Sequence, residues 1–172
     1  MIEWKNKSRR SDIKGSLMDD KIEKRLNTNR NINRGYRKLE VWQEAVELFG
    51  FVRKKIKSLN EISFKIKAQI EDSILSVSSN IAEGYCRRFL KENIQFNTYA
   101  LSSLGENYSQ IFTLLNSDDI DIEWFDLYDE MHYSLENKLI SLNKKCIEYL
   151  EKDGEWKSDY IIKDPFVIYD EK

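Results

Sequence analysis

The sequence predicts an all-α fold, an antiparallel up-down four-helix bundle with a flexible basic N-terminal arm and a short C-terminal tail. Two observations predict it. The 172 residues include only one Pro and six Gly, while 34% are charged, a composition typical of long solvated helices. Within residues 39–150, large apolar residues recur every three or four positions, the period of an amphipathic helix rather than of a strand. A chain of this length suffices for one domain with its own core.

The chain divides into an arm (residues 1–35), the bundle (residues 36–152) and a tail (residues 153–172). The arm is rich in Asn, Arg and Lys and has no sustained apolar period, so we expect it to be flexible apart from a short helix near residues 17–26. Its first 17 residues differ in character from the rest of the chain, which makes Met18 a second candidate for the start of translation.

The net charge of −2 is unevenly distributed along the chain. Residues 1–38 hold 12 Lys and Arg against 5 Asp and Glu, which gives +7, whereas residues 39–150 carry −6 and residues 151–172 carry −3. A basic segment joined to an acidic body is either a tether for nucleic acid or a solvated tail.

The first predicted helix spans residues 39–59. Gly50 near its middle weakens the helix by up to about 1 kcal/mol relative to Ala. The basic side chains near its end suit the negative end of the helix dipole. Its expected core face consists of apolar residues spaced by three or four: Leu39, Trp42, Val46, Phe49, Val52, Ile56 and Leu59.

The second predicted helix spans residues 63–84 and carries three stripes. We expect Gly84 to adopt the left-handed conformation that ends a helix. One of these stripes, Leu75, Ala82 and Cys86, consists of small or mildly apolar residues. It would allow another helix of the bundle or of a neighbouring subunit to approach closely. The buried stripe is Ile66, Ile70, Ile74, Val77 and Ile81; the polar stripe is Gln69, Ser73, Ser76, Asn80, Glu83 and Arg87; the third is Leu75, Ala82 and Cys86.

Two further helices are predicted over residues 91–115 and 122–150, and residues 116–119 between them supply capping oxygens. In the tail, Pro165 excludes a continuous helix, and the apolar residues 160–162 and 166–169 are candidates for docking on the bundle. The expected core residues of the third helix are Ile94, Leu101, Leu104, Tyr108, Ile111 and Leu115, and those of the fourth are Trp124, Tyr128, Met131, Leu135, Leu139, Leu142, Cys146 and Tyr149.

The residues offer little catalytic chemistry, so we predict no catalytic residue, no metal and no cofactor. A di-iron bundle needs a Glu-x-x-His pair on each of two helices, but His132 is the only His, and we expect it at the surface or boundary of its helix. Cys86 and Cys146 form neither a disulfide framework nor a metal site. A magnesium-dependent nucleotide hydrolase is the least favoured alternative; its candidate acidic pairs are Glu44 with Glu47 and Glu123 with Asp126.

Two basic clusters are candidates for binding nucleic acid. The first consists of Arg87, Arg88 and Lys91, and the second of Arg53, Lys54, Lys55 and Lys57. In an up-down bundle the two clusters lie at opposite ends, so they do not form one patch within a monomer. The alternative is that both are solvated helix ends.

Three motifs together resemble one bacterial family. They are Leu-Glu-Val-Trp-Gln in residues 39–43, Ser-Asn-Ile-Ala-Glu-Gly in residues 79–84, and Ser-Leu-Gly-Glu in residues 103–106. Over residues 36–150 the chain resembles the four-helix-bundle proteins called 23S ribosomal RNA intervening sequence proteins, whose relatives include the accessory variability determinant proteins of diversity-generating retroelements. Residues 71 and 72, often basic in such proteins, are Glu71 and Asp72 here.

The resemblance implies a bundle that assembles into a homopentameric ring, without established enzymatic activity. In the retroelement relatives the ring binds nucleic acid and contacts a reverse transcriptase. The residues that we assign to this structural and oligomeric signature are Gln69, Ser76, Asn80, Glu83, Gly84, Ser103 and Glu106.

Within this signature, we expect Asn80 and Glu83 to bond to polar residues of the third helix, such as Ser103 or Asn107, and to fix the register of the helices. A partly buried amide or carboxylate without such a bond costs about 1–3 kcal/mol. The alternative is a plain polar boundary with solvent.

The favoured function is therefore a non-enzymatic, ring-forming accessory protein that binds RNA or DNA beside a reverse transcriptase or another protein. The alternative is a structural or protein-interaction module that binds no nucleic acid. The sequence has neither an apolar signal core at its start nor a run of about 20 apolar residues, so we expect a soluble cytoplasmic protein.

Overall fold

A computed structural model describes residues 22, 24–28 and 32–152 of the chain. Its regular elements are a 3-10 helix, η1 (Ile32–Lys38), and four long helices, α2 (Glu40–Ser58), α3 (Phe64–Cys86), α4 (Leu90–Asn116) and α5 (Ile122–Glu151). Every regular element of the described part is helical, which confirms the predicted all-α class.

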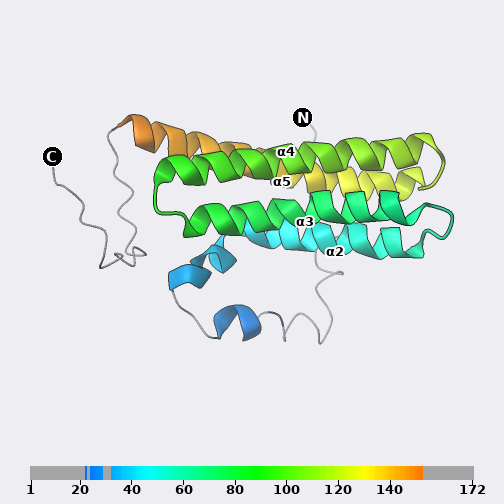
Figure 1. Ribbon diagram of the computed structural model, residues 1–172, viewed down its shortest axis with the longest axis horizontal. Coiled ribbons are helices and arrows are strands. Elements are labelled where there is room, and N and C mark those ends of the chain that lie inside the picture. The colour runs from blue at the N-terminus through cyan, green and yellow to red at the C-terminus, as the bar shows by residue number, and fades with distance from the viewer. Residues whose placement is uncertain (1–21, 23, 29–31, 153–172) are drawn as a thin grey trace, which may run out of the picture.

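The four long helices lie side by side in a closed bundle (Figure 1). Each packs against the next in sequence, and α5 returns to pack against α2. Loops of only a few residues join them, so consecutive helices run in opposite directions. We call the end with η1, the α3–α4 loop and the end of α5 the first pole, and the end with the α2–α3 and α4–α5 loops the second pole.

The packed structure extends beyond the expected bundle. The 3-10 helix η1 begins at Ile32, before the expected boundary at residue 36, and packs against α2 and α3. Of the short helix expected near residues 17–26, residues 22 and 24–26 are described and are helical. The candidate start at Met18 and the proposed docking of residues 160–162 and 166–169 lie outside the described residues.

The helix ends differ in two places from the sequence prediction. Asp121, rather than residues 116–119, caps α5, because its carboxylate accepts the N–H of Trp124 at 2.8 Å. Gly84 does not end α3, which continues to Cys86, and no glycine of the described residues has a positive φ. The left-handed residue is instead Asp118, with φ of 60°, just after α4.

The core consists of branched aliphatic side chains from all four long helices. On α2 the predicted Val52 and Ile56 are buried, but the first half of the predicted face was displaced by one residue, because Ala45 and Leu48 are buried whereas Val46 is 41% exposed. On α3 the predicted stripe is buried from Ile70 onward, but Ile66 in the first turn is 42% exposed. Within the described residues, no helix is both long enough and apolar enough to cross a membrane.

Candidate nucleic-acid interface

The first basic cluster surrounds the short connection between α3 and α4. Arg87 is the residue after α3, and its N–H donates to the carbonyl of Gly84 at 3.2 Å. Its guanidinium pairs with Glu83 and lies 4.6 Å from the centre of the Phe96 ring on α4, close enough for a cation–π contact. Arg88 lies 5.4 Å from the ring of Phe89 in the same way. Aromatic contacts therefore hold both arginines at the first pole.

Gly84 sets how closely α3 and α4 approach at this pole. A Cβ atom on Gly84 would lie 2.8 Å from Cβ of Phe96 and 3.3 Å from the carbonyl oxygen of Asn93. Real Cβ atoms do not approach so closely, so only glycine permits this helix crossing. The glycine of the signature thus positions Phe96, on which the Arg87 guanidinium lies.

The structure brings part of the basic arm to the same pole, which the sequence did not reveal. Tyr36 anchors η1 to the bundle. The centre of its ring lies 5.2 Å from that of Trp42 and 6.3 Å from that of Tyr85. The thiol of Cys86 contacts the carbonyl of Asn33 at 3.4 Å. Three basic residues of η1 therefore lie beside the end of α3: Arg34, Arg37 and Lys38.

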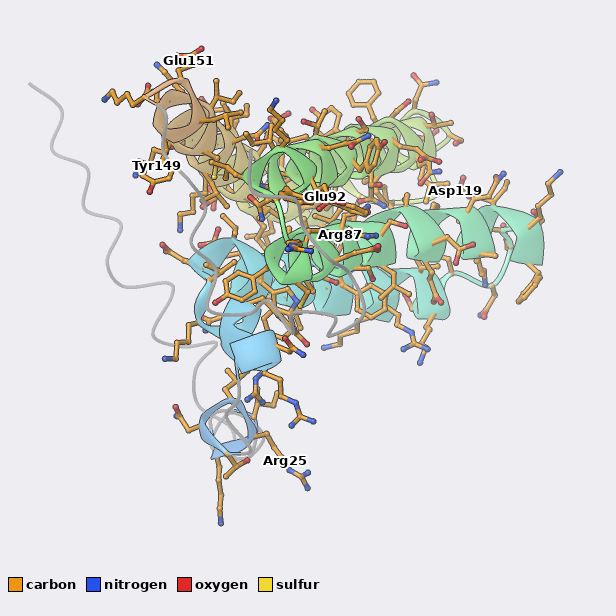
Figure 2. All side chains as sticks on the ribbon, turned by 60° about the vertical axis from the view of Figure 1, so that its left-hand side comes forward. Arg25, Arg87, Glu92, Asp119, Tyr149 and Glu151 are labelled. Carbon is orange, nitrogen blue, oxygen red and sulfur yellow. The ribbon has the colours of Figure 1, made fainter. Side chains whose placement is uncertain are left out.

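Arg37 also ties the preceding segment to η1. Its guanidinium donates to the carbonyl of Arg25 at 3.1 Å and to that of Thr28 at 3.1 Å. Figure 2 shows Arg25 and Arg87 at the same end of the molecule. The first-pole basic surface, as we define it, comprises Arg25, Arg34, Arg37, Lys38, Arg87, Arg88 and Lys91.

Acidic residues lie close to this surface. Figure 2 shows Glu92 at the start of α4 and Glu151 at the end of α5 facing the same pole as Arg87. Glu92 accepts the N–H of Phe89 at 3.3 Å and so caps α4, while Glu83 pairs with Arg87. The first pole is therefore a mixed-charge surface in which the basic groups come from η1 and the α3–α4 loop.

The second basic cluster lies at the second pole and is partly neutralised. Lys55 donates to Asp121 at 2.6 Å and lies 5.6 Å from the Trp124 ring centre, and Arg53 is 3.7 Å from Glu71. Lys54 and Lys57 are exposed. Because α2 ends at the pole opposite to the end of α3 (Figure 1), the two clusters do not merge within one chain.

The polar bonds between α3 and α4 involve other residues than we expected. Asn107 of α4 is fully buried and donates to Oγ of Ser73 at 3.0 Å and to the carbonyl of Ile70 at 3.2 Å. Ser73 in turn donates to Gln110 at 2.7 Å. Asn107 does bond to α3, as we expected from the sequence. Its partner on α3 is Ser73, however, and not Asn80 or Glu83.

The remaining signature residues line the exposed side of these helices. Gln69 and Glu106 are exposed, and Glu106 accepts from Gln110 at 3.1 Å. The side chains of Ser76, Asn80 and Ser103 are half-buried. Within one chain, Gly84 is therefore the signature residue that packs between helices, whereas Gln69 and Glu106 face outward.

The network continues across the core to α5. The hydroxyl of Tyr128 donates to Oδ1 of Asn107 at 3.0 Å, and burial raises the pKa of Tyr128 far above its usual range. His132 is 4% exposed and its Nε2 lies 3.0 Å from the carbonyl of Leu104. The expected surface position of His132 is therefore wrong: its hydrogen bond to the backbone allows it to be buried.

The magnesium site of the least favoured alternative does not form. Glu44 pairs with Lys138 and therefore lies beside that part of α5. Lys138 and Glu123 are fifteen residues apart on α5, which separates Glu44 from Glu123 by roughly 22 Å along the bundle. The second member of each pair, Glu47 on α2 and Asp126 on α5, lies one turn closer to the other pair. These two turns together shorten the distance between the pairs by less than half. No group of three His, Cys, Asp or Glu suited to a metal occurs in the described part.

The two thiols are not activated nucleophiles. Burial raises the pKa of the Cys86 thiol and of the Cys146 thiol. A nucleophilic Cys has a lowered pKa instead, so the surroundings of neither thiol activate it.

Comparison with known protein families identifies a match over most of the bundle. The model of the family described as 23S rRNA-intervening sequence protein matches residues 37–141. A search of curated protein sequences found no match. The family match covers α2, α3, α4 and most of α5, and it confirms the resemblance seen in the sequence.

Proposed function

Because the chain belongs to the family of 23S rRNA-intervening sequence proteins, we propose that it is a non-enzymatic accessory protein that binds nucleic acid as a ring of identical subunits. The ring is a pentamer, as the family resemblance implies. It works in the cytoplasm beside a ribonucleoprotein or a reverse transcriptase. The first-pole basic surface contacts the phosphates.

One observation carries this proposal: basic residues far apart in the sequence meet at one pole. Arg34 and Lys38 on η1 lie beside the α3–α4 loop that carries Arg87 and Arg88. Phosphate contacts supply most of the sequence-independent affinity for nucleic acid, and they require clustered cations. Acidic groups at this pole, such as Glu83 and Glu92, reduce the local positive potential, so the +7 carried by residues 1–38 is an essential part of the proposal.

Apolar side chains on the outside of the bundle are available for contacts between the subunits of a ring. Phe64 is 85% exposed and Tyr133 is 65% exposed, and Leu75 and Phe112 are about half exposed. Single exposed side chains are common on any protein surface, and only a contiguous patch of them marks a contact between proteins. These side chains are equally available to the second candidate, a protein-interaction module that binds no nucleic acid.

The experiment compares salt-dependent binding of a duplex by two triple variants. Each lost phosphate contact lowers the log–log salt slope by about 0.9. We expect Arg34→Ala/Lys38→Ala/Lys91→Ala to lower the slope by roughly 2–3. The matched control, Arg53→Ala/Lys54→Ala/Lys57→Ala at the second pole, keeps the wild-type slope.

Light scattering on the same samples measures the assembly. A pentamer that takes up duplex or RNA at low salt and releases it at high salt is the expected result. A pentamer that binds neither at low salt would reject the nucleic-acid function and favour the protein-interaction module. Equal losses in both triple variants would reject the first pole as the interface.

A further inference from the structure

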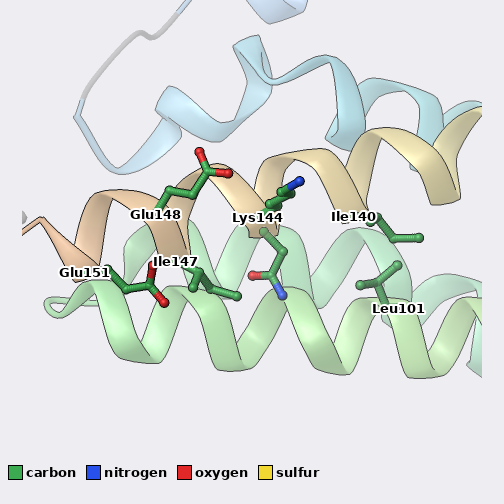
Figure 3. Close-up of a pocket in the computed structure, with 7 residues that line it drawn as sticks. Leu101, Ile140, Lys144, Ile147, Glu148 and Glu151 are labelled. Atoms are coloured by element: carbon green, nitrogen blue, oxygen red, sulfur yellow. The ribbon is translucent and has the colours of Figure 1, made fainter.

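A groove follows the seam between α4 and α5 and leaves apolar side chains uncovered. Its volume is about 500 Å³. Figure 3 shows Leu101 on α4 beside Ile140 on α5, with Ile147 farther along α5 toward Glu151. Ile140 is 49% exposed and Ile147 is 40% exposed. The polar residues of the lining all come from α5: Asn143, Lys144, Glu148 and Glu151.

The groove begins where α5 ends. Glu151 is both the last residue of α5 and part of the lining. The chain continues for twenty residues after Lys152, and these lie outside the residues matched by the family model. They include eight large apolar residues: Trp156, Tyr160, Ile161, Ile162, Phe166, Val167, Ile168 and Tyr169.

We propose that residues 155–169 of this chain lie extended in the α4–α5 groove and run antiparallel to α5. Gly154 gives the chain freedom to reverse direction. Pro165 excludes a continuous helix through this segment, which favours an extended strand-like form. The proposal concerns the tail alone and does not depend on nucleic-acid binding.

The spacing of charges supports this register. Two residues of an extended chain cover about 6.6 Å, and four residues of a helix cover about 6 Å, so alternate tail residues meet every fourth residue of α5. If Lys157 lies opposite Glu148, then Asp159 lies opposite Lys144. The next two pairs are Ile161 with Ile140 and Lys163 with Glu136. Each of these four pairs is complementary in charge or polarity.

The position of Glu136, the expected partner of Lys163, agrees with an extended tail along the α4–α5 groove. Glu136 is half-buried and acts electrostatically on Tyr108 of α4, so it faces the same seam as the groove lining. A tail following this line would cover Ile140 with Ile161. It would do so without disturbing Lys145, which is exposed and does not line the groove.

A charge exchange tests the register by the rate at which chymotrypsin cleaves the tail of the full-length protein. We expect Lys144→Glu to raise the rate at least fivefold, because Asp159 then faces a like charge. Lys144→Glu combined with Asp159→Lys restores the wild-type rate within twofold. The matched control is Lys145→Glu, one residue away, which leaves the rate unchanged. Equal effects of Lys144→Glu and Lys145→Glu, or no rescue by the second change, would overturn the register.

A second measurement identifies which copy supplies the tail. A spin label on Ser158→Cys, in a Cys86→Ser/Cys146→Ser background, should broaden the methyl signals of Ile140 and Ile147 but not of Ile122 at the second pole. The broadening persists when labelled chains are diluted with unlabelled, NMR-silent ones. Docking by the chain's own tail would be overturned if the label broadened neither methyl signal. It would also be overturned if broadening occurred only in mixed samples, in which the label and the observed methyl group are on different copies.

Discussion

Gly84 of α3 and Phe96 of α4 are in direct contact, and a Cβ atom on the glycine would lie 2.8 Å from Cβ of Phe96. Gly84→Ala should therefore force the two helices apart. Overpacking costs typically about 1–3 kcal/mol, which exceeds the gain of up to about 1 kcal/mol from replacing a glycine within a helix. We expect a net loss of stability, measured by urea unfolding.

The chain supplies a matched control for this substitution. Gly50 is also within a helix but is exposed, and a Cβ atom there would meet nothing within 4 Å. Gly50→Ala should stabilise the protein by about 0.5–1 kcal/mol. If both substitutions change the free energy of unfolding in the same direction, the close contact at Gly84 does not limit the helix crossing.

The buried bond between Tyr128 and Asn107 should contribute measurably to stability. Tyr128→Phe removes one donor and leaves an Oδ1 atom unpaired, at a cost of about 1–2 kcal/mol. Asn107→Ala should cost more, about 2–4 kcal/mol, because Ser73 and the Ile70 carbonyl also lose a partner. In a double-mutant cycle of the two changes, a coupling near zero would contradict the network.

The ion pair of Asp121 with Lys55 makes stability depend on acid. The bond from Lys55 and the N–H of Trp124 lower the pKa of Asp121. A carboxyl group with a lowered folded pKa stabilises the protein above its unfolded pKa of about 3.9, and this contribution is lost as the pH falls through the folded value.

Asp121→Asn tests this pair while preserving the helix cap, because Asn is an equally good N-cap residue. We expect the variant to be less stable than the wild type at pH 7 and the difference to vanish in strong acid. Asp126→Asn, an exposed change on the next turn of α5, is the control. Thermal melting from pH 2 to pH 7 measures both, and a pH-independent difference for Asp121→Asn would contradict the assigned cause.

Tyr36 should control nucleic-acid binding without controlling the bundle. Its ring connects η1 to Trp42 and Tyr85, so Tyr36→Ala should release η1 and remove its three cations from the first-pole basic surface. We expect weaker duplex binding and a salt slope lower by roughly 2, with the bundle still folded. Leu127→Ala, at a residue 48% exposed on α5, is the control and should leave the slope unchanged.

The positions of the helices could be read from the sequence, and so could the rotation of α3, but the rotation of the first half of α2 could not. The first helix was expected over residues 39–59 and is found over Glu40–Ser58. The first half of its core face was nevertheless displaced by one residue toward Val46, because Trp42, Val46 and Phe49 are more apolar than Ala45. Ala45 is fully buried all the same, because the core side of α2 is set by contact with the other helices and not by the size of the side chain.

The candidate site was only partly predictable, for a similar reason. Arg87, Arg88 and Lys91 were found as a local cluster, and the separation of the second cluster followed from bundle topology. The contribution of η1 was missed because residues 32–38 have no helical periodicity. Their placement on α3 depends on the contact of Tyr36 with Tyr85, which lies far away in sequence.

The sequence by itself determined the all-α class, the four long helices and the family, because helical periodicity and the local motifs are properties of neighbouring residues. Only the tertiary structure decided the role of Gly84, the burial of His132 and Asn107, and the grouping of basic residues at the first pole. Each of these depends on which residues of another helix lie within a few ångströms, and packing between helices, rather than the order of residues within one helix, sets that distance.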